Sequence, residues 1–269
     1  MVHKVLVAGG DGRMLRLVQL LKKDGFDVQT RGLLPQETED REAVDVILFP
    51  YPFSLKNGQI PSFTGEKLNP EQILSCARKD TLIIAQRGME SYGTFAHYTD
   101  AQDFERRNAE ISAEATVYEV MQRTEKALMD LRILITGYGL FARALARKLQ
   151  AFGADIWVAA RRIEARKLAR EDGMEAVSLQ EMDAILGSVD FVLNTVPAQI
   201  FTQEHLRRLR PETWLLELAS APYGFSRDEA QTLGLRSALL PGLPAKYAPH
   251  SAALALEKAV LSLIEEAKQ

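Results

Sequence analysis

The sequence predicts an α/β protein with two Rossmann-like, doubly wound parallel-sheet domains, of which the second binds a dinucleotide. Short apolar segments alternate with helical patterns along most of the 269 residues, which is typical of βαβ units. One turn between an apolar segment and a helical pattern reads Gly137-Tyr-Gly139-Leu-Phe-Ala142, a G-x-G-x-x-A sequence. The length is sufficient for two domains that each have a core of their own.

The bulk composition excludes several classes of protein. Hydrophobic residues make up 46% of the chain, charged residues make up 26%, and the formal net charge is −3. This balance provides no overall basic field for nucleic acid or an anionic membrane. No apolar segment is long enough to cross a bilayer, no signal-peptide pattern is present, and the single cysteine, Cys76, excludes an internal disulfide. We therefore expect a cytoplasmic protein without a nucleic-acid or membrane partner.

The first hundred residues predict a flavodoxin-like domain. A buried strand at residues 3–8 leads into the turn Gly9-Gly10-Asp11-Gly12, and apolar residues at helical spacing follow as far as Leu21. The glycine spacing in this turn differs from that of dinucleotide-binding proteins. Further strands are expected at residues 26–30, 45–49 and 81–85, with a helix over residues 70–77.

A connector helix and a second α/β region follow. Residues 109–129 predict a long helix with one buried apolar stripe. The members of this stripe are Ile111, Ala115, Tyr118, Met121 and Leu128. From residue 131 onward, strands and helices alternate through short turns, which predicts a parallel sheet. The strands are expected near residues 132–136, 155–159, 190–194, 213–218 and 235–240, and the helices between them near residues 163–172, 179–186, 203–209 and 226–233.

These elements divide the chain into two domains. The flavodoxin-like domain is predicted to comprise residues 1–117 and a final helix at residues 250–269 that returns to it. The second domain is predicted to comprise residues 118–249. Ligands of open α/β sheets lie beyond the carboxyl ends of the strands, so we expect the dinucleotide on the second domain and the substrate beside the first.

The turn at residues 137–142 has the chemistry of a phosphate-binding loop. Gly137 permits a tight turn, Gly139 lets the backbone approach a pyrophosphate, and Ala142 lets the helix pack closely on the strand. Leu140 and Phe141 occupy the first helical turn, where N–H groups and the helix dipole favour an anion. A purely structural βαβ turn would show the same pattern, but the surrounding strand and helix favour nucleotide binding.

The second strand of this domain runs into Arg161 and Arg162. Enzymes that prefer NAD usually carry Asp or Glu there to bind the ribose 2′-hydroxyl, and a carboxylate would repel a 2′-phosphate. A guanidinium binds a phosphate with two hydrogen bonds. The sequence therefore favours NADP over NAD, although two arginines are also an ordinary start for a solvated helix.

Segments that follow the later strands provide further candidates. We expect Asn194 and Thr195 to lie near the nicotinamide ribose, and Ser220 to face the nicotinamide or the substrate. His250 and Glu114 are candidate acids or bases, and Arg13, at a helix N-terminus, is a candidate for binding a carboxylate. Each has an ordinary structural explanation as a turn, cap or surface residue. The remaining candidates are Val196, Pro197, Ala219, Gly242 and Pro244 for the cofactor, and Asp11, Asn108 and Ser112 for the substrate.

The sequence contains no nucleophile elbow, Walker loop or metal-ligand cluster, so we predict no bound metal. The residues alone thus predict a two-domain NADP-binding protein that transfers a hydride to or from a small anionic metabolite. Spacing does not identify that metabolite.

Several motifs together resemble the A subunit of dipicolinate synthase from spore-forming bacteria, over nearly the whole chain. The resemblance is strongest from Asn108 to the C-terminus. Its motifs are Gly9-Gly10-Asp11, Asn108 with Ser112 and Glu114, Gly137-Tyr-Gly139, Ala160-Arg161, Asn194-Thr-Val-Pro197, Leu218-Ala-Ser220, and Pro241-Gly-Leu-Pro244 with Ala248-Pro249.

The resemblance implies the last step of dipicolinate formation during sporulation, in the cytoplasm of the mother cell. There a dihydrodipicolinate is oxidised to pyridine-2,6-dicarboxylate with NADP+, and the family works with a flavoprotein second subunit. We also expect a homo-oligomer. The two substrate carboxylates would need donors, for which Arg13, Ser112, Ser220 and His250 are the candidates. The chain departs from the family pattern at Ile111-Ser112, where Pro-Thr is common, at Ala115, and at His250, where Lys is frequent.

Two other functions remain open. A 2-hydroxyacid-dehydrogenase-like oxidoreductase shares the two-domain plan, but such enzymes need an Arg after the position of Ser220, where this chain reads Ala-Pro-Tyr-Gly. A non-catalytic NADP-binding subunit that regulates a partner is consistent with the small number of acid–base candidates.

Overall fold

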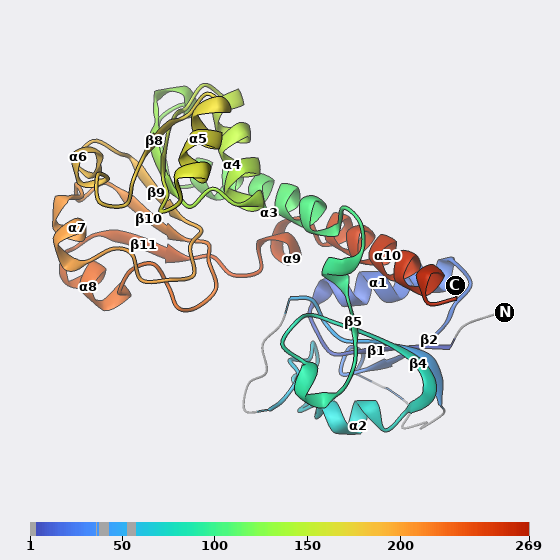
Figure 1. Cartoon of the computed structure of the whole chain (residues 1–269). Coiled ribbons are helices and arrows are strands. Elements are labelled where there is room, and N and C mark those ends of the chain that lie inside the picture. The colour runs from blue at the N-terminus through green and yellow to red at the C-terminus, as the bar shows by residue number, and fades with distance from the viewer. Residues whose placement is uncertain (1–3, 36, 38–42, 53–57, 269) are drawn as a thin grey trace. The chain divides into compact units, whose positions relative to one another are not determined.

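The computed structural model describes residues 4–35, 37, 43–52 and 58–268, and the chain divides into two compact units (Figure 1). Unit 1 consists of Met1–Asn108 and Pro244–Gln269, and unit 2 consists of Ala109–Leu243. The two boundaries between the units, at residues 108/109 and 243/244, come earlier in the chain than the predicted boundaries at residues 117/118 and 249/250. They fall inside the helices α3 (Phe104–Met121) and α9 (Leu243–Tyr247), where the sequence shows no linker.

Unit 1 is built on a five-stranded parallel sheet. Its strands are β1 (Lys4–Ala8), β2 (Asp27–Arg31), β3 (Val44–Leu48), β4 (Ala77–Ala85) and β5 (Ala96–His97). They lie in the order β2-β1-β3-β4-β5, which is the flavodoxin-like order that the sequence predicts. Residue 3, predicted to open the first strand, lies outside the described residues. The two-residue β5 was not predicted because it is too short to show a period.

The α-helices that lie wholly within unit 1 are α1 (Gly12–Lys23), α2 (Pro70–Leu74) and α10 (Pro249–Glu266). Asp11 caps α1, since its side chain accepts a hydrogen bond from the N–H of Arg13. Apolar side chains recur on one face of α1, and this face is buried, with α10 packed along the helix (Figure 1). The final helix therefore returns to unit 1, as the sequence predicts. Three-residue 3₁₀ helices lie at Glu90–Tyr92 and Tyr98–Asp100 in unit 1 and at Leu128–Asp130 in unit 2.

Helix α3 differs from the predicted connector at residues 109–129. It begins at Phe104 and ends at Met121, and two members of the predicted buried stripe are exposed, Tyr118 by 46% and Met121 by 53%. A broad apolar surface is buried instead of a single stripe, because small residues such as Ala113 also turn inward. Because apolar residues fall on several faces of α3, its sequence does not show which face is covered.

Unit 2 contains a six-stranded parallel sheet. Its strands are β6 (Arg132–Thr136), β7 (Asp155–Ala159), β8 (Glu175–Val177), β9 (Phe191–Asn194), β10 (Trp214–Glu217) and β11 (Arg236–Leu239). They lie in the order β11-β10-β9-β6-β7-β8, which is the Rossmann order with its reversal between β6 and β9. All predicted strands of this half are present, and β8 was not predicted. The helices are α4 (Leu140–Ala151), α5 (Ile163–Glu171), α6 (Asp183–Leu186), α7 (Gln203–Arg208) and α8 (Arg227–Thr232).

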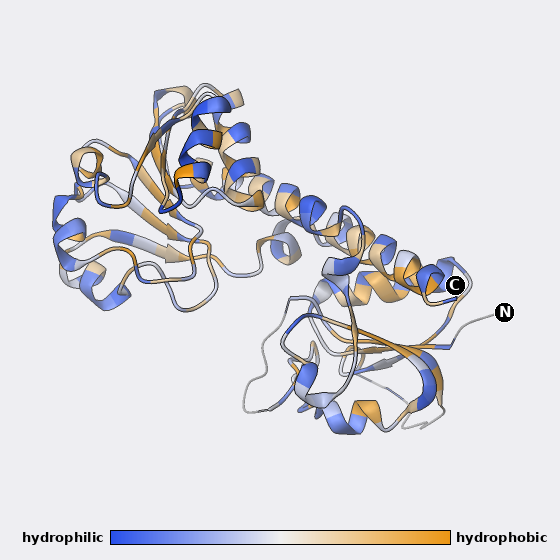
Figure 2. Cartoon of the chain, viewed as in Figure 1, coloured by the Kyte–Doolittle hydropathy of each residue, from blue (hydrophilic) through white to orange (hydrophobic). Residues whose placement is uncertain are grey.

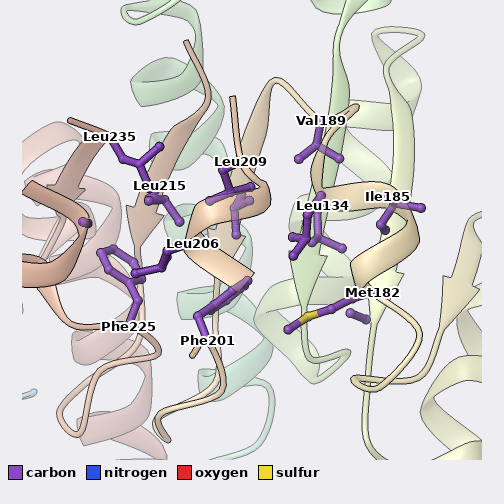
Figure 3. Close-up of a cluster of buried hydrophobic side chains, with 14 residues drawn as sticks. Leu134, Met182, Ile185, Val189, Phe201, Leu206, Leu209, Leu215, Phe225 and Leu235 are labelled. Carbon is purple, nitrogen blue, oxygen red and sulfur yellow. The ribbon is translucent and has the colours of Figure 1, made fainter. Parts of the chain in front are cut away.

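One core cluster of unit 2 lies between its sheet and the helices α6 and α7 (Figure 3). Leu134 on β6 and Leu215 on β10 are fully buried in it, together with Phe201. Several strands in Figure 2 are coloured as apolar over much of their length, which is expected when helices cover a parallel sheet. None of the helices in the described residues is both long and apolar enough to cross a membrane.

Candidate functional site

The glycine-rich turn of unit 2 has space for an anion at the start of α4. Gly137 has a φ of +81°, and a Cβ there would lie 2.9 Å from Thr195 Oγ1, so only glycine fits. Gly139 is the N-cap of α4 and makes no side-chain cap, and a Cβ there would meet no atom within 4 Å. Ala142, 1% exposed, lets α4 pack on the sheet. The uncapped N–H groups and the open space above Gly139 fit a pyrophosphate.

The corresponding turn of unit 1 is closed. Its N–H at Gly10 donates to the carbonyl of Pro61 at 2.6 Å, and a Cβ on Gly9 would lie 2.5 Å from the same oxygen. The carboxylate of Asp11 already caps α1. A phosphate would therefore meet a filled turn and a negative charge. The two sheets share a strand–turn–helix, but only unit 2 keeps the helix N-terminus open.

A network of charged and polar side chains holds the glycine turn in place. Asp172 accepts hydrogen bonds from the Tyr138 hydroxyl at 2.8 Å, from Arg143 Nε at 2.6 Å and from Arg147 at 3.0 Å. The hydrogen bond from Arg143, together with those from Arg147 and Tyr138, holds the pKa of Asp172 far below its usual range. Burial and the bond to Asp172 raise the pKa of Tyr138. Tyr138 lies between the two glycines, so this network fixes the turn against α4.

Asp172→Asn should lower the stability of the protein by about 1–2 kcal/mol at neutral pH, after allowance for the half-exposed arginines. A carboxyl whose folded pKa is depressed stabilises the fold above its unfolded pKa, near 4, and loses this contribution as the pH falls toward the folded value. The difference in Tm between the two proteins should therefore shrink below about pH 5. Thermal unfolding of the unmodified chain and of Asp172→Asn at several pH values measures this difference in Tm.

Asp155→Asn is the matched control, because Asp155 forms one ion pair with Arg132 in which both side chains are 44% exposed. Its effect on Tm should be small. A difference for Asp172→Asn that stays constant from pH 7 to pH 3 would show that the ion pairs contribute nothing.

The end of β7 presents two exposed cations. Arg161 and Arg162 are both exposed directly after this strand, and Arg162 is the N-cap of α5. Arg166 holds the backbone of this segment, since its Nη1 donates to the carbonyl of Ala160 at 2.8 Å and to that of Arg161 at 2.9 Å. The turn is therefore fixed while the two guanidinium groups remain accessible, which suits a phosphate on the adenosine ribose.

Asn194 is held in a buried hydrogen-bond network at the end of β9. Its side chain is fully buried and accepts from Thr136 Oγ1 at 2.6 Å, while its Nδ2 donates to Glu217 Oε1 at 2.6 Å. Thr195 Oγ1 donates to the carbonyl of Thr136 at 2.6 Å. Both side chains thus hold the ends of neighbouring strands together, and their place near the nicotinamide ribose stays a prediction. Val196 is half-buried and Pro197 is exposed after β9.

Glu217 is a functional candidate that the sequence analysis missed. It is 1% exposed at the end of β10, and burial raises the pKa of its carboxyl against the opposing effect of its hydrogen-bond donors. Oε1 accepts from Asn194 and from the N–H of Ala219 at 3.1 Å, and Oε2 accepts from the N–H of Gly224 at 2.8 Å. A carboxylate inside the apolar strand Trp214-Leu-Leu-Glu217 was the available signal.

The other candidates of unit 2 are spread over several elements. Ser220 is exposed in the segment after β10, and Glu114 is exposed on α3. Ser112, also on α3, is half-buried, and its carbonyl accepts from the Thr116 hydroxyl at 2.8 Å. Gly242 has a φ of +66° in the exposed turn before α9.

In unit 1 the structure brings Asp11 and Arg13 together. Arg13 is 3% exposed, and its Nε donates to Asp11 Oδ1 at 2.9 Å while Nη2 donates to Oδ2 at 2.5 Å. Asn108 is half-buried on α3, Pro244 is buried in α9, and His250 is exposed in the first turn of α10. The predicted substrate and catalytic residues are therefore divided between the two units.

Tyr51 is a further polar group near Arg13 that the sequence analysis missed. It follows β3, whose neighbour β1 precedes Arg13, so the two residues flank the point where the strand order of unit 1 reverses. Burial raises the pKa of Tyr51, the negative charge of Glu105 adds to this, and the positive charge of Arg13 opposes it. The ring packs edge-on against Phe104, with centroids 4.9 Å apart. A phenol and a guanidinium at such a point can bind a carboxylate.

Comparisons with known proteins agree with this geometry. Residues 4–91 match the family described as the N-terminal domain of the dipicolinate synthase A subunit. Residues 98–223 match the NAD-binding domain of D-isomer-specific 2-hydroxyacid dehydrogenases. Over 98% of its length the chain is 26% identical to the dipicolinate synthase A subunit of Bacillus subtilis, of which 96% is covered.

Two solved structures have the same fold over almost the whole chain. The dipicolinate synthase A subunit of Bacillus halodurans has a TM-score of 0.87 and 25% identity, with 97% of each chain covered. The A chain of dipicolinate synthase from Bacillus subtilis has a TM-score of 0.85 and 23% identity, with 100% of this chain and 97% of that chain covered. The predicted resemblance and the two-domain α/β fold are confirmed, and unit 2 is a domain of the type that binds a nicotinamide dinucleotide.

Proposed function

We propose that this chain, which is similar to the dipicolinate synthase A subunit over nearly its whole length, is an oxidoreductase subunit that oxidises a dihydrodipicolinate to pyridine-2,6-dicarboxylate with NADP+. The observation that carries the proposal is the open, uncapped start of α4 beside two exposed arginines at the end of β7. The closed turn of unit 1 supports binding of the dinucleotide by unit 2, and we propose unit 1 for the substrate.

The residues of unit 2 would bind and orient the cofactor. NADP+ supplies a hydride acceptor when it is bound. The N–H groups at the start of α4 would bind its pyrophosphate, and Arg161 and Arg162 would bind the 2′-phosphate. In a Rossmann sheet the second half, here β9 to β11, takes the nicotinamide nucleotide. Ser220 would then lie on the nicotinamide side.

The substrate would be a small ring with two carboxylates. Loss of a hydride and a proton from a dihydropyridine ring yields an aromatic product, so positioning contributes more than a strong base. We propose Arg13 and Tyr51 as donors to one carboxylate, which would share the guanidinium of Arg13 with its present partner Asp11. Ser112, Asn108, Glu114 and His250 remain proposed as substrate or proton-transfer residues.

The proposal includes a partner. The name of the Bacillus subtilis relative describes a subunit of a larger enzyme. We propose that this chain forms a homo-oligomer and works with a flavoprotein second subunit in the cytoplasm of the mother cell.

An assay of the purified chain tests the reaction. We expect NADPH and the pyridine absorbance to rise together when NADP+ and freshly generated dihydrodipicolinate are added, in equal amounts because one hydride is removed for each ring. The same reaction with the flavoprotein partner shows whether the partner is required. Absence of both products in both mixtures would contradict the proposal.

A 2-hydroxyacid dehydrogenase is the second candidate, because residues 98–223 match the nucleotide-binding domain of that class. The same assay with NAD+ or NADP+ and a panel of 2-hydroxy acids separates the two. Cofactor reduction by a 2-hydroxy acid, without turnover of dihydrodipicolinate, would favour the second candidate. Cofactor binding without any turnover would favour a regulatory subunit.

A further inference from the structure

The carboxylate of Glu217 is buried at the end of β10, and its hydrogen-bond donors among the described residues are uncharged. Oε1 accepts from Asn194 Nδ2 at 2.6 Å and from the N–H of Ala219 at 3.1 Å, and Oε2 accepts from the N–H of Gly224 at 2.8 Å. Burying a carboxylate without a cation is unfavourable, and three hydrogen bonds offset part of that cost. The use of such a group therefore lies in what its hydrogen bonds hold in place.

Two of the hydrogen bonds to Glu217 come from residues on either side of one exposed segment. Ala219 and Gly224 lie at the two ends of the four exposed residues from Ser220 to Tyr223. Gly224 passes so close to the side chain of Asn194 that a Cβ there would lie 2.4 Å from Nδ2. We call residues 218–224 the β10 loop. Glu217 thus fixes this loop on both sides of its four exposed residues.

The same network reaches the glycine turn. Thr136, the last residue of β6, donates to Asn194 Oδ1 at 2.6 Å, and Asn194 donates to Glu217. The chain of hydrogen bonds crosses the neighbouring strands β6, β9 and β10, and so spans the point where the strand order of unit 2 reverses. The two halves of a dinucleotide meet at such a point.

We propose that Glu217 is a positioning residue that holds the β10 loop in the shape required by the nicotinamide half of the cofactor. This inference rests on the proposed binding of NADP+ by unit 2. Glu217 itself is too deeply buried to touch the cofactor, and it acts through Asn194, Ala219 and Gly224.

Glu217→Gln tests the inference. A glutamine offers one acceptor oxygen, so whichever way its amide is oriented, its NH2 group faces at least one of the three N–H donors. The affinity for NADP+ should fall about tenfold, because a buried donor loses its partner. The affinity for 2′,5′-ADP, which carries only the adenosine half, should be unchanged. Titration calorimetry with both ligands measures the two values.

The matched control is Glu175→Gln, an exposed position on β8 of the same sheet, which should alter neither affinity. The fold should survive Glu217→Gln because the carbonyl of Gly224 still accepts from the N–H groups of Ile200 and Phe201 at 3.0 and 2.9 Å. If it does not, Thr136→Val, which removes only the hydroxyl bound to Asn194, should give a smaller loss of NADP+ affinity with 2′,5′-ADP again unaffected.

The outcomes separate this inference from the proposed function. If the unmodified chain binds neither ligand, the cofactor assignment and the role of Glu217 are both wrong. If the unmodified chain binds both, and the variant binds NADP+ as tightly or loses both ligands equally, only the positioning role is wrong.

Discussion

Gly139→Asp should strongly weaken dinucleotide binding and leave the protein folded. Gly139 has a φ of −83° and open space where a Cβ would stand, so an aspartate fits without strain. As an N-cap, aspartate is also slightly better than glycine for helix stability. A carboxylate there would oppose the pyrophosphate, and two like charges at about 4 Å repel by about 4 kcal/mol at an effective dielectric constant of 20. The affinity should fall at least about a hundredfold.

Gly12→Asp is the matched control in unit 1. Gly12 opens α1 after the corresponding first strand, and a Cβ there also meets no atom within 4 Å. Gly12→Asp should bind the dinucleotide as tightly as the unmodified chain does. The Tm of each of the two variants shows whether it is folded. If Gly12→Asp loses binding and Gly139→Asp keeps it, the dinucleotide lies on unit 1 and the assignment made from the glycine turns is wrong.

The fold could be predicted from the sequence where periodicity was strong. β6 and β7 have the predicted bounds, because each is a largely apolar strand next to a glycine. Gly137 follows β6, and Gly153 precedes β7. β5 and β8 were missed because two or three residues carry no period. The predicted bounds and buried stripe of α3 were wrong because the buried residues of this helix are spread over several faces and show no single apolar stripe.

Some parts of the candidate site could be predicted from the sequence and others could not. The glycine turn was predictable, since the sequence pattern places Gly137 where the turn needs a positive φ and leaves no room for a Cβ. The pairing of Asn194 with Glu217 was not, because it depends on which strands become neighbours, and β9 and β10 are joined by a long stretch of chain. Arg13 was recognised as a candidate for binding an anion, but its salt bridge with Asp11 depends on side-chain geometry.

Arg161→Asp should reverse the choice between the two nicotinamide cofactors. Arg161 is exposed, and its backbone is held by Arg166, so the substitution changes the charge and leaves the turn in place. The 2′-phosphate would lose a guanidinium and face a carboxylate, which should lower the affinity for NADP+ by about a hundredfold. The affinity for NAD+ should stay the same or rise, since an acidic residue at this place can bind the ribose 2′-hydroxyl.

Arg161→Gln distinguishes loss of attraction from added repulsion, and it should lower NADP+ affinity by a smaller factor. Arg227→Asp, at an exposed first residue of α8, is the control for the same change of charge elsewhere in unit 2. Dissociation constants for both cofactors at one ionic strength measure the effect, because phosphate contacts weaken with added salt. If Arg161→Asp leaves the ratio of the two constants unchanged, the phosphate lies elsewhere, and the exposed arginines only begin a solvated helix.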